Sequence, residues 1–274
     1  MSEIENSWVS FQLKKQQYGI PTRHILEMIP LRNQTVIPDV PEFVRGIINL
    51  RGKIVPLVDL RKRLGMESLI EETENLINVL NLRKQDHINW LCELFASVDE
   101  KREFKLTTDP HKCAFGKWYD TFECDNIYLK ILLEKFDEPH KNIHAVAVKV
   151  GELLQANRRP QAIELIESTR DIQLSKMIGL FDQAVELLKE HTTEIVVVVD
   201  YMNMPFGFVV DSVSDVVEIS DDMIEASPAL NGGSNCFMQG LGKVGDSLKI
   251  LLDLNQLLFS QDIAQLKEIS AQVV

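Results

Sequence analysis

Residues 46–65 have the sequence GIINLRGKIVPLVDLRKRLG. Two apolar runs are separated by Arg51 and Gly52, which favours a β-hairpin although this pair is not the strongest turn signal. Five prolines lie within residues 21–56 and argue against long helices there. Upstream, residues 8–13 alternate with period two, as expected for a half-buried strand. The first part of the chain is therefore predicted to be β-structure.

Helical spacing replaces this pattern from about residue 67 to residue 192. Apolar side chains recur at intervals of three and four, beginning with Leu76, Val79 and Leu80. An acidic or basic residue followed by proline predicts three helix starts, at Asp109-Pro110, Glu138-Pro139 and Arg159-Pro160.

The strand pattern then resumes in a β-branched run at residues 195–199, followed by residues 207–217 and 248–254. Residues 262–272 are amphipathic and predict a terminal helix. The order β, α, β predicts an α+β chain in which a helical domain, residues 67–192, interrupts a β-domain made of residues 1–66 and 193–274. Such an insertion requires neighbouring entry and exit points, which an antiparallel bundle with an even number of long helices provides.

Composition excludes several function classes. The 274 residues are 45% hydrophobic and 26% charged with a net charge of -12, typical of a globular protein and unfavourable for binding nucleic acid or anionic membranes. No apolar run approaches transmembrane length, and the polar N-terminus lacks a signal-peptide pattern, so a cytoplasmic location without membrane insertion is expected. Four scattered cysteines then predict thiols or metal ligands rather than disulfides.

The two β-segments resemble the CheW-like family of bacterial chemotaxis through residues 46–65, 207–217, 237–246 and 251–254. The resemblance implies two small five-stranded β-barrel-like subdomains around a shared core. It also implies a non-catalytic scaffold that bridges the histidine kinase CheA and the cytoplasmic tip of a chemoreceptor, in association with receptor arrays. Its partner-binding surface would include the segment Asn49, Leu50, Arg51 and Gly52.

Arg51 suits a partner contact, because its guanidinium pairs with acidic or amide groups on another protein. The alternative is that Arg51 only caps a turn or pairs within the fold. Three carboxylates lie between apolar residues, at Asp59, Asp211 and Asp253, and are expected to end strands or cap turns. No catalytic residue is assigned in the β-domain.

The helical region holds the residues with metal chemistry. His140 and His144 are four apart and therefore share one face of a helix. This spacing suits a zinc ion, Zn2+, and one thiolate with one further imidazole would complete a tetrahedral site. Histidine pairs at this spacing also occur by chance.

The flanking sequences resemble the chemoreceptor zinc-binding domain, CZB, at residues 86–90, 113–119 and 139–144. The resemblance spans about residues 75–190 and implies a four-helix bundle, often dimeric. Its zinc ligands would be His87, Cys113, His140 and His144.

Other histidines and cysteines are weaker candidates. His111, at the expected start of a short helix and pointing away, is the rival ligand. Cys92 and Cys124 are predicted as small buried side chains, and Cys236 as structural.

A site closed by four protein ligands argues against hydrolysis, because no position is left for water. Cys113, kept as a thiolate by zinc, is the redox-reactive atom, and its oxidation would weaken one ligand. The resemblance to CZB suggests a response to hypochlorous acid or to zinc itself. The leading hypothesis is a sensory adaptor whose zinc domain modulates coupling. The alternatives are a purely structural zinc bundle and, remotely, a zinc hydrolase with Glu138 as general base.

Overall fold

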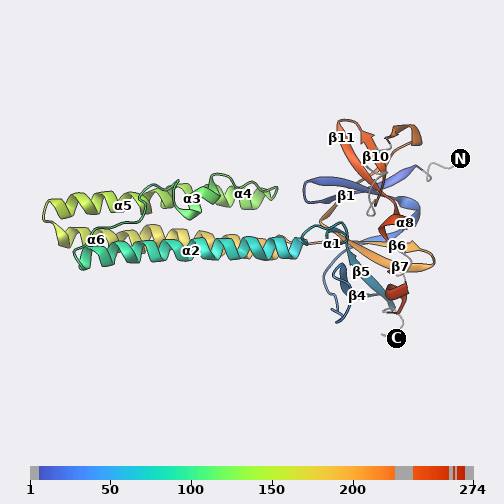
Figure 1. The fold of residues 1–274 in the computed structure, drawn as a ribbon, viewed down its shortest axis with the longest axis horizontal. Coiled ribbons are helices and arrows are strands. Elements are labelled where there is room, and N and C mark those ends of the chain that lie inside the picture. The colour runs from blue at the N-terminus through green and yellow to red at the C-terminus, as the bar shows by residue number, and fades with distance from the viewer. Residues whose placement is uncertain (1–5, 226–236, 259–261, 263, 269–274) are drawn as a thin grey trace. The chain divides into compact units, whose positions relative to one another are not determined.

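A computed structural model of the chain describes residues 6–225, 237–258, 262 and 264–268. The chain divides into two compact units. The β-unit combines Met1–Glu71 with Thr193–Val274, and the helical unit comprises Glu72–Thr192. The predicted α+β organisation, with helices between two β-segments, is confirmed (Figure 1).

The β-unit contains two sheets, each built from strands of both β-segments. The six-stranded sheet has the order β8 (Ser212–Glu218), β1 (Ser7–Leu13), β2 (Gln16–Pro21), β11 (Ser247–Leu252), β10 (Met238–Val244) and β9 (Ile224–Glu225). The five-stranded sheet has the order β3 (Ile25–Pro30), β6 (Ile195–Tyr201), β7 (Met204–Val210), β5 (Lys53–Asp59) and β4 (Val44–Leu50). The extra strand relative to the expected pair of five is the two-residue β9.

A shared hydrophobic core explains why the two distant segments fold together. Phe11 and Ile20 of one sheet pack in the same cluster as Phe206 and Phe208 of the other. Strand β6 contributes to two clusters, because Val197 and its alternate neighbours face one and Val196 and its neighbours face the other. Burial on both faces accounts for its continuous β-branched sequence.

The predicted hairpin at residues 46–60 is formed by β4 and β5, which pair from Val44↔Val58 to Leu50↔Lys53. Both turn residues have positive φ, 53° at Arg51 and 84° at Gly52, as a two-residue hairpin turn of type I′ requires. Asp59 ends β5 and accepts a hydrogen bond from the Lys62 backbone N–H, so it caps the short helix α1 (Leu60–Arg63). The capping role expected of Asp59 is therefore confirmed.

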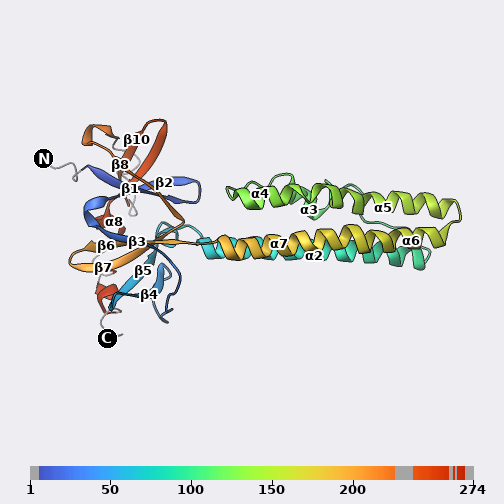
Figure 2. The same ribbon diagram turned by 180° about the vertical axis from the view of Figure 1, so that it is seen from behind.

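The helical unit is built from α2 (Leu69–Asp99), α3 (Ala114–Tyr119), α4 (Ile127–Glu134), α5 (Asp137–Gln155), α6 (Arg159–Thr169), the π-helical turn η2 (Arg170–Leu174) and α7 (Ser175–His191). Helices α2 and α7 lie side by side, where Lys84 Nζ is 2.8 Å from Asp182 Oδ1 (Figure 2). Residues 100–126, between α2 and α4, are mostly without regular structure, and the short α3 is the helical part of this segment.

Two of the three predicted helix starts are confirmed. Helix α5 has Pro139 in its first turn, and α6 has Pro160 there. The start expected at Asp109-Pro110 is wrong, since the helix begins at Ala114. The Asp109 carboxylate instead accepts a hydrogen bond from the His111 backbone N–H and forms a turn.

The predicted C-terminal helix lies partly outside the described residues. Residues 264–268 are helical, and the remainder of residues 262–272 is described only at Asp262. Cys236, predicted as structural, also lies outside the described part of the chain.

Candidate metal centre

Four side chains from three parts of the helical unit converge in its core. His87 lies on α2, Cys113 directly precedes α3, and His140 and His144 lie one turn apart on α5. One potential ligand atom from each lies within 4.8 Å of those of the other three. Cys113 Sγ is 3.2 Å from His140 Nε2. The fold therefore brings together all four residues that the sequence predicted as ligands.

Unpaired ring nitrogens make this cluster fit a metal ion. His87 Nδ1 donates to the Arg83 carbonyl at 2.7 Å, which leaves the Nε2 atom with a free lone pair. That Nε2 and both ring nitrogens of His144 are buried without a hydrogen-bond partner. A buried polar atom without a partner is destabilising, and coordination to a cation would satisfy it. Three imidazoles and one thiol form a donor set that suits zinc.

The loop before α3 holds the sulfur in place. The Gly116 backbone N–H donates to Cys113 Sγ at 3.1 Å, so the side chain of Cys113 caps α3. The thiol donates to the Pro110 carbonyl at 3.3 Å. A Cβ atom at Gly116 would lie 1.9 Å from that same carbonyl oxygen. Glycine is thus required for the close approach of the two backbone segments around the sulfur.

Replacing Gly116 with alanine is expected to weaken zinc binding by about 10–100-fold, the usual effect of disturbing groups that orient metal ligands. The collision is between backbone atoms, so the loop carrying Cys113 must move. Competition titration with a chromogenic chelator measures the affinity. Gly151→Ala is the matched control. Gly151 also lies in the helical unit, on α5, and a Cβ atom added there would have no other atom within 4 Å. Equal affinities of the two variants would contradict this role for Gly116.

Aromatic rings surround the cluster and exclude water. The Phe115 ring centroid lies 4.9 Å from that of His140 and 5.5 Å from that of His87. Trp90 lies 4.9 Å from His144 and donates its indole N–H to the Thr107 carbonyl at 2.9 Å. Trp90 and Phe115 are buried. The candidate ligands therefore lie in a largely apolar setting.

Burial controls the protonation of the cluster. It lowers the pKa of His140 to about 3 and the pKa of His144 to about 4, with the neighbouring His87 adding to both shifts. Burial also lowers the pKa of His87 and raises the pKa of the Cys113 thiol. The imidazoles are consequently neutral near pH 7, as metal binding requires, while the thiol must release its proton to solvent when a cation binds.

The remaining histidine and cysteine candidates lie outside the cluster. His111 is exposed, precedes α3 rather than starting it, and its Nδ1 is 2.9 Å from Asp120 Oδ2. Cys92 is exposed on α2, so the prediction of a buried side chain is wrong; it lies five residues after the inward-facing His87. Cys124 is half-buried against the helical core.

The four residues proposed for partner binding comprise the end of β4, Asn49 and Leu50, and the two turn residues Arg51 and Gly52. The Asn49 side chain accepts a hydrogen bond from the Gly52 N–H at 2.9 Å and stabilises the turn. Arg51 is 80% exposed, and its Nη2 lies 2.8 Å from Glu27 Oε2. The guanidinium thus pairs within the fold and still faces solvent, while Leu50 is half-buried.

Comparison with protein families identifies both parts of the chain. Residues 7–89 and 172–262 match the CheW-like domain, well over half of the sequence. The chain belongs to the CheW-like family. Residues 87–150 match the chemoreceptor zinc-binding domain, and this range contains the four converging side chains. A CheW-like protein with an inserted CZB domain is what the sequence predicted.

Several curated relatives are chemotaxis CheW proteins. The Helicobacter pylori protein is 32% identical over 81 residues, which are 30% of this chain and 48% of that protein. The Thermotoga maritima protein is 33% identical over 110 residues, 40% of this chain and 71% of that protein. The chain spans about half the length of the first two curated relatives it matches. A solved structure, the scaffolding protein TtCheW of Thermoanaerobacter tengcongensis, is similar with 17% identity and a TM-score of 0.44, covering 94% of this chain and 90% of that one.

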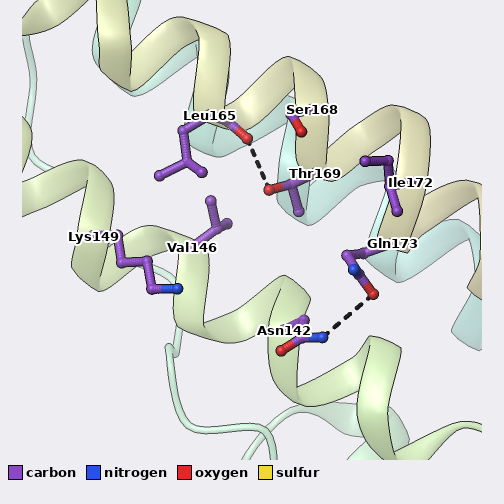
Figure 3. Close-up of a pocket in the computed structure, with 8 residues that line it drawn as sticks. All are labelled: Asn142, Val146, Lys149, Leu165, Ser168, Thr169, Ile172 and Gln173. Atoms are coloured by element: carbon purple, nitrogen blue, oxygen red, sulfur yellow. Dashed lines mark hydrogen bonds between the residues drawn. The ribbon is translucent and has the colours of Figure 1, made fainter.

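Two further features bear on the CheW-like chain. Within the part described, no helix combines the length and apolarity needed to cross a bilayer. A hollow of about 290 Å³ lies between α5 on one side and α6 with the π-helical turn on the other (Figure 3). Two of its polar side chains bond within its own lining, from Asn142 to Gln173 and from Thr169 to the Leu165 carbonyl. The four clustered side chains do not line it, and we assign it no ligand.

Proposed function

We propose that this chain is a chemotaxis adaptor that links chemoreceptor tips to the histidine kinase CheA, and that its helical unit regulates this link. The observation that carries the proposal is the combination in one chain of a CheW-like β-unit and a buried cluster of three histidines and a cysteine. The exposed turn Asn49–Gly52 is the proposed partner contact. We propose no catalytic activity and place the protein in the cytoplasm at receptor arrays.

His87, Cys113, His140 and His144 would hold one zinc ion. The unpaired buried nitrogens and the neutral imidazoles support this assignment. Because all four ligands would come from the protein, the site has the composition of a structural or regulatory centre and not of a hydrolase. Pairing of two chains through the helical unit stays a prediction.

Cys113 is the proposed point of attack by hypochlorous acid. Zinc, when bound, would keep this residue as a thiolate, the form that oxidants attack. The residue Cys113 is half-buried whereas the three histidines are buried, so it is the most accessible residue of the four. In the net reaction, the O–Cl bond of HOCl breaks and an S–O bond forms. Thiolate and HOCl yield sulfenic acid and chloride, so the sulfur loses two electrons and the chlorine gains them. A sulfenic acid is a poorer metal ligand than a thiolate, and α3 would lose the capping interaction at its first turn.

The test measures CheA kinase activity in reconstituted arrays that contain receptor, kinase and this chain. Adding hypochlorous acid at about one equivalent is expected to release zinc and to change kinase output with the wild type. Cys113→Ser is expected to give no oxidant response. Cys92→Ser, which removes an exposed thiol on α2, is the matched control and should respond like the wild type.

Three outcomes separate the parts of this proposal. Arrays in which this chain does not support kinase activation would refute the adaptor role. Zinc release without a change in kinase output would leave the metal purely structural. An undiminished response of Cys113→Ser would show that another group is oxidised.

A further inference from the structure

A buried cluster of charges lies in the β-unit where the helical insertion begins and ends. Arg45 is 13% exposed, and its Nη1 lies 2.8 Å from Asp59 Oδ2. The same guanidinium binds both carboxylate oxygens of Glu194, at 3.1 Å and 2.7 Å. Asp59 and Glu194 are 2% and 7% exposed. One cation therefore joins two carboxylates that are far apart in sequence.

The two carboxylates flank the insertion. Asp59 caps α1, after which the chain enters α2, and Glu194 follows the end of α7 by three residues. Within the helical unit the hydroxyls of Thr73 and Thr192 lie 3.5 Å apart, so its two ends are neighbours. A change in the spacing of α2 and α7 would therefore act on the chain segments that carry the two carboxylates.

The backbone around Arg45 is shaped to aim its side chain at this cluster. The pairing of β4 with β5 shifts register between Val44 and Gly46, so Arg45 is the extra residue of a β-bulge. Bulges redirect a side chain out of the regular alternation of a strand. Gly46 has a φ of 132°, and a Cβ there would lie 2.2 Å from the Thr35 carbonyl oxygen. The bulge thus depends on glycine at this position.

Strand β4 leads directly from Arg45 to the exposed turn. Asn49 lies four positions after Arg45, and its side chain holds that turn closed. We propose that Arg45 is a positioning residue that couples both ends of the helical unit to the Asn49–Gly52 turn. The coupling rests on the proposed function, in which the helical unit is regulatory and this turn contacts a partner. It needs no contact between the units beyond the two chain connections.

Amide hydrogen exchange of the full chain tests this coupling without a kinase. Exchange is compared for zinc-loaded and chelator-stripped protein, by mass spectrometry of peptides covering residues 84–118 and 45–55. In the wild type, stripping is expected to speed exchange severalfold in both regions. In Glu194→Gln the change in residues 84–118 should persist and the change in residues 45–55 should be lost.

Two further variants make the result specific. Glu186→Gln alters an exposed carboxylate on α7 and should behave like the wild type. Arg45→Lys keeps the charge, but an ammonium lacks the planar fork that binds Glu194 through two nitrogens, and it carries the test if Glu194→Gln is poorly folded. An unchanged response of residues 45–55 in the Arg45 and Glu194 variants, or no response there in the wild type, would overturn the coupling. No response in residues 84–118 would instead refute zinc binding, and the coupling with it.

Discussion

Replacing His140 with alanine is expected to reduce zinc affinity by more than about 100-fold, because disturbing groups behind the ligands already costs about 10–100-fold. His140 is buried, and its Nε2 lies 3.2 Å from the Cys113 sulfur. At a free zinc concentration 100 times the wild-type dissociation constant, zinc binding stabilises the folded wild type by about 2.7 kcal/mol, and the variant loses most of this stabilisation. Elemental mass spectrometry of tag-free protein measures zinc per chain, and thermal unfolding measures the stability.

His111→Ala is the matched control for this prediction. His111 lies two positions before Cys113 in the sequence, yet its side chain is 62% exposed and its ring pairs with Asp120. Zinc content and melting temperature of this variant should equal those of the wild type. Equal zinc contents of His140→Ala and wild type would remove His140 from the ligand set, and a loss in His111→Ala would place the rival imidazole in it.

Replacing Arg45 with methionine is expected to destabilise the β-unit by about 3–5 kcal/mol, the usual effect of removing one partner from a buried ion pair. Methionine occupies a similar volume, so the loss comes from two buried carboxylates left without a cation. Burial already raises the pKa of Glu194, and Arg45 opposes this shift. Urea unfolding followed by amide hydrogen exchange of peptides from the β-unit measures the effect.

The loss in Arg45→Met should also depend on pH. Without the guanidinium the folded-state pKa of Glu194 rises further above its unfolded value, so the penalty is present at neutral pH and shrinks as acid protonates the carboxylate. The destabilisation is therefore smaller near about pH 5 than near about pH 7.

Arg51→Met is the control for Arg45→Met. It removes an 80% exposed guanidinium that also pairs with one glutamate, and exposed pairs contribute no more than about 1 kcal/mol. Similar losses in both variants, or a pH-independent loss in Arg45→Met, would contradict the account of a buried charge cluster.

Much of the organisation could be predicted from local patterns. The hairpin at residues 46–60 and the strand Ile195–Val199 carry short-range signals, because turn geometry and burial on both faces restrict the residues allowed there. Local patterns failed where a backbone contact from elsewhere determined the conformation. Asp109-Pro110 has the composition of a helix start, yet the approach of the Pro110 carbonyl to Gly116 places the helix start at Ala114.

Local sequence patterns also did not predict whether particular side chains are buried or exposed. Cys92 is a small apolar side chain directly after the buried Trp90 and Leu91 of α2, but it is exposed. The buried charges of Arg45 and Glu194 were missed for the same reason. Their only sequence signal is a charge next to apolar strand residues, at Val44-Arg45-Gly46 and at Glu194 before the β6 run.

The order of β-segments and helices and the residue types of the metal cluster follow from local patterns, because periodicity and ligand chemistry are local properties of the chain. The meeting of His87, Cys113 and the two histidines of α5 at one place depends on the packing of the helices, since these residues come from separate elements and lie up to 57 positions apart. The tertiary structure also decided which carboxylates meet Arg45, because a β-bulge and the return of the chain after the insertion bring the three together.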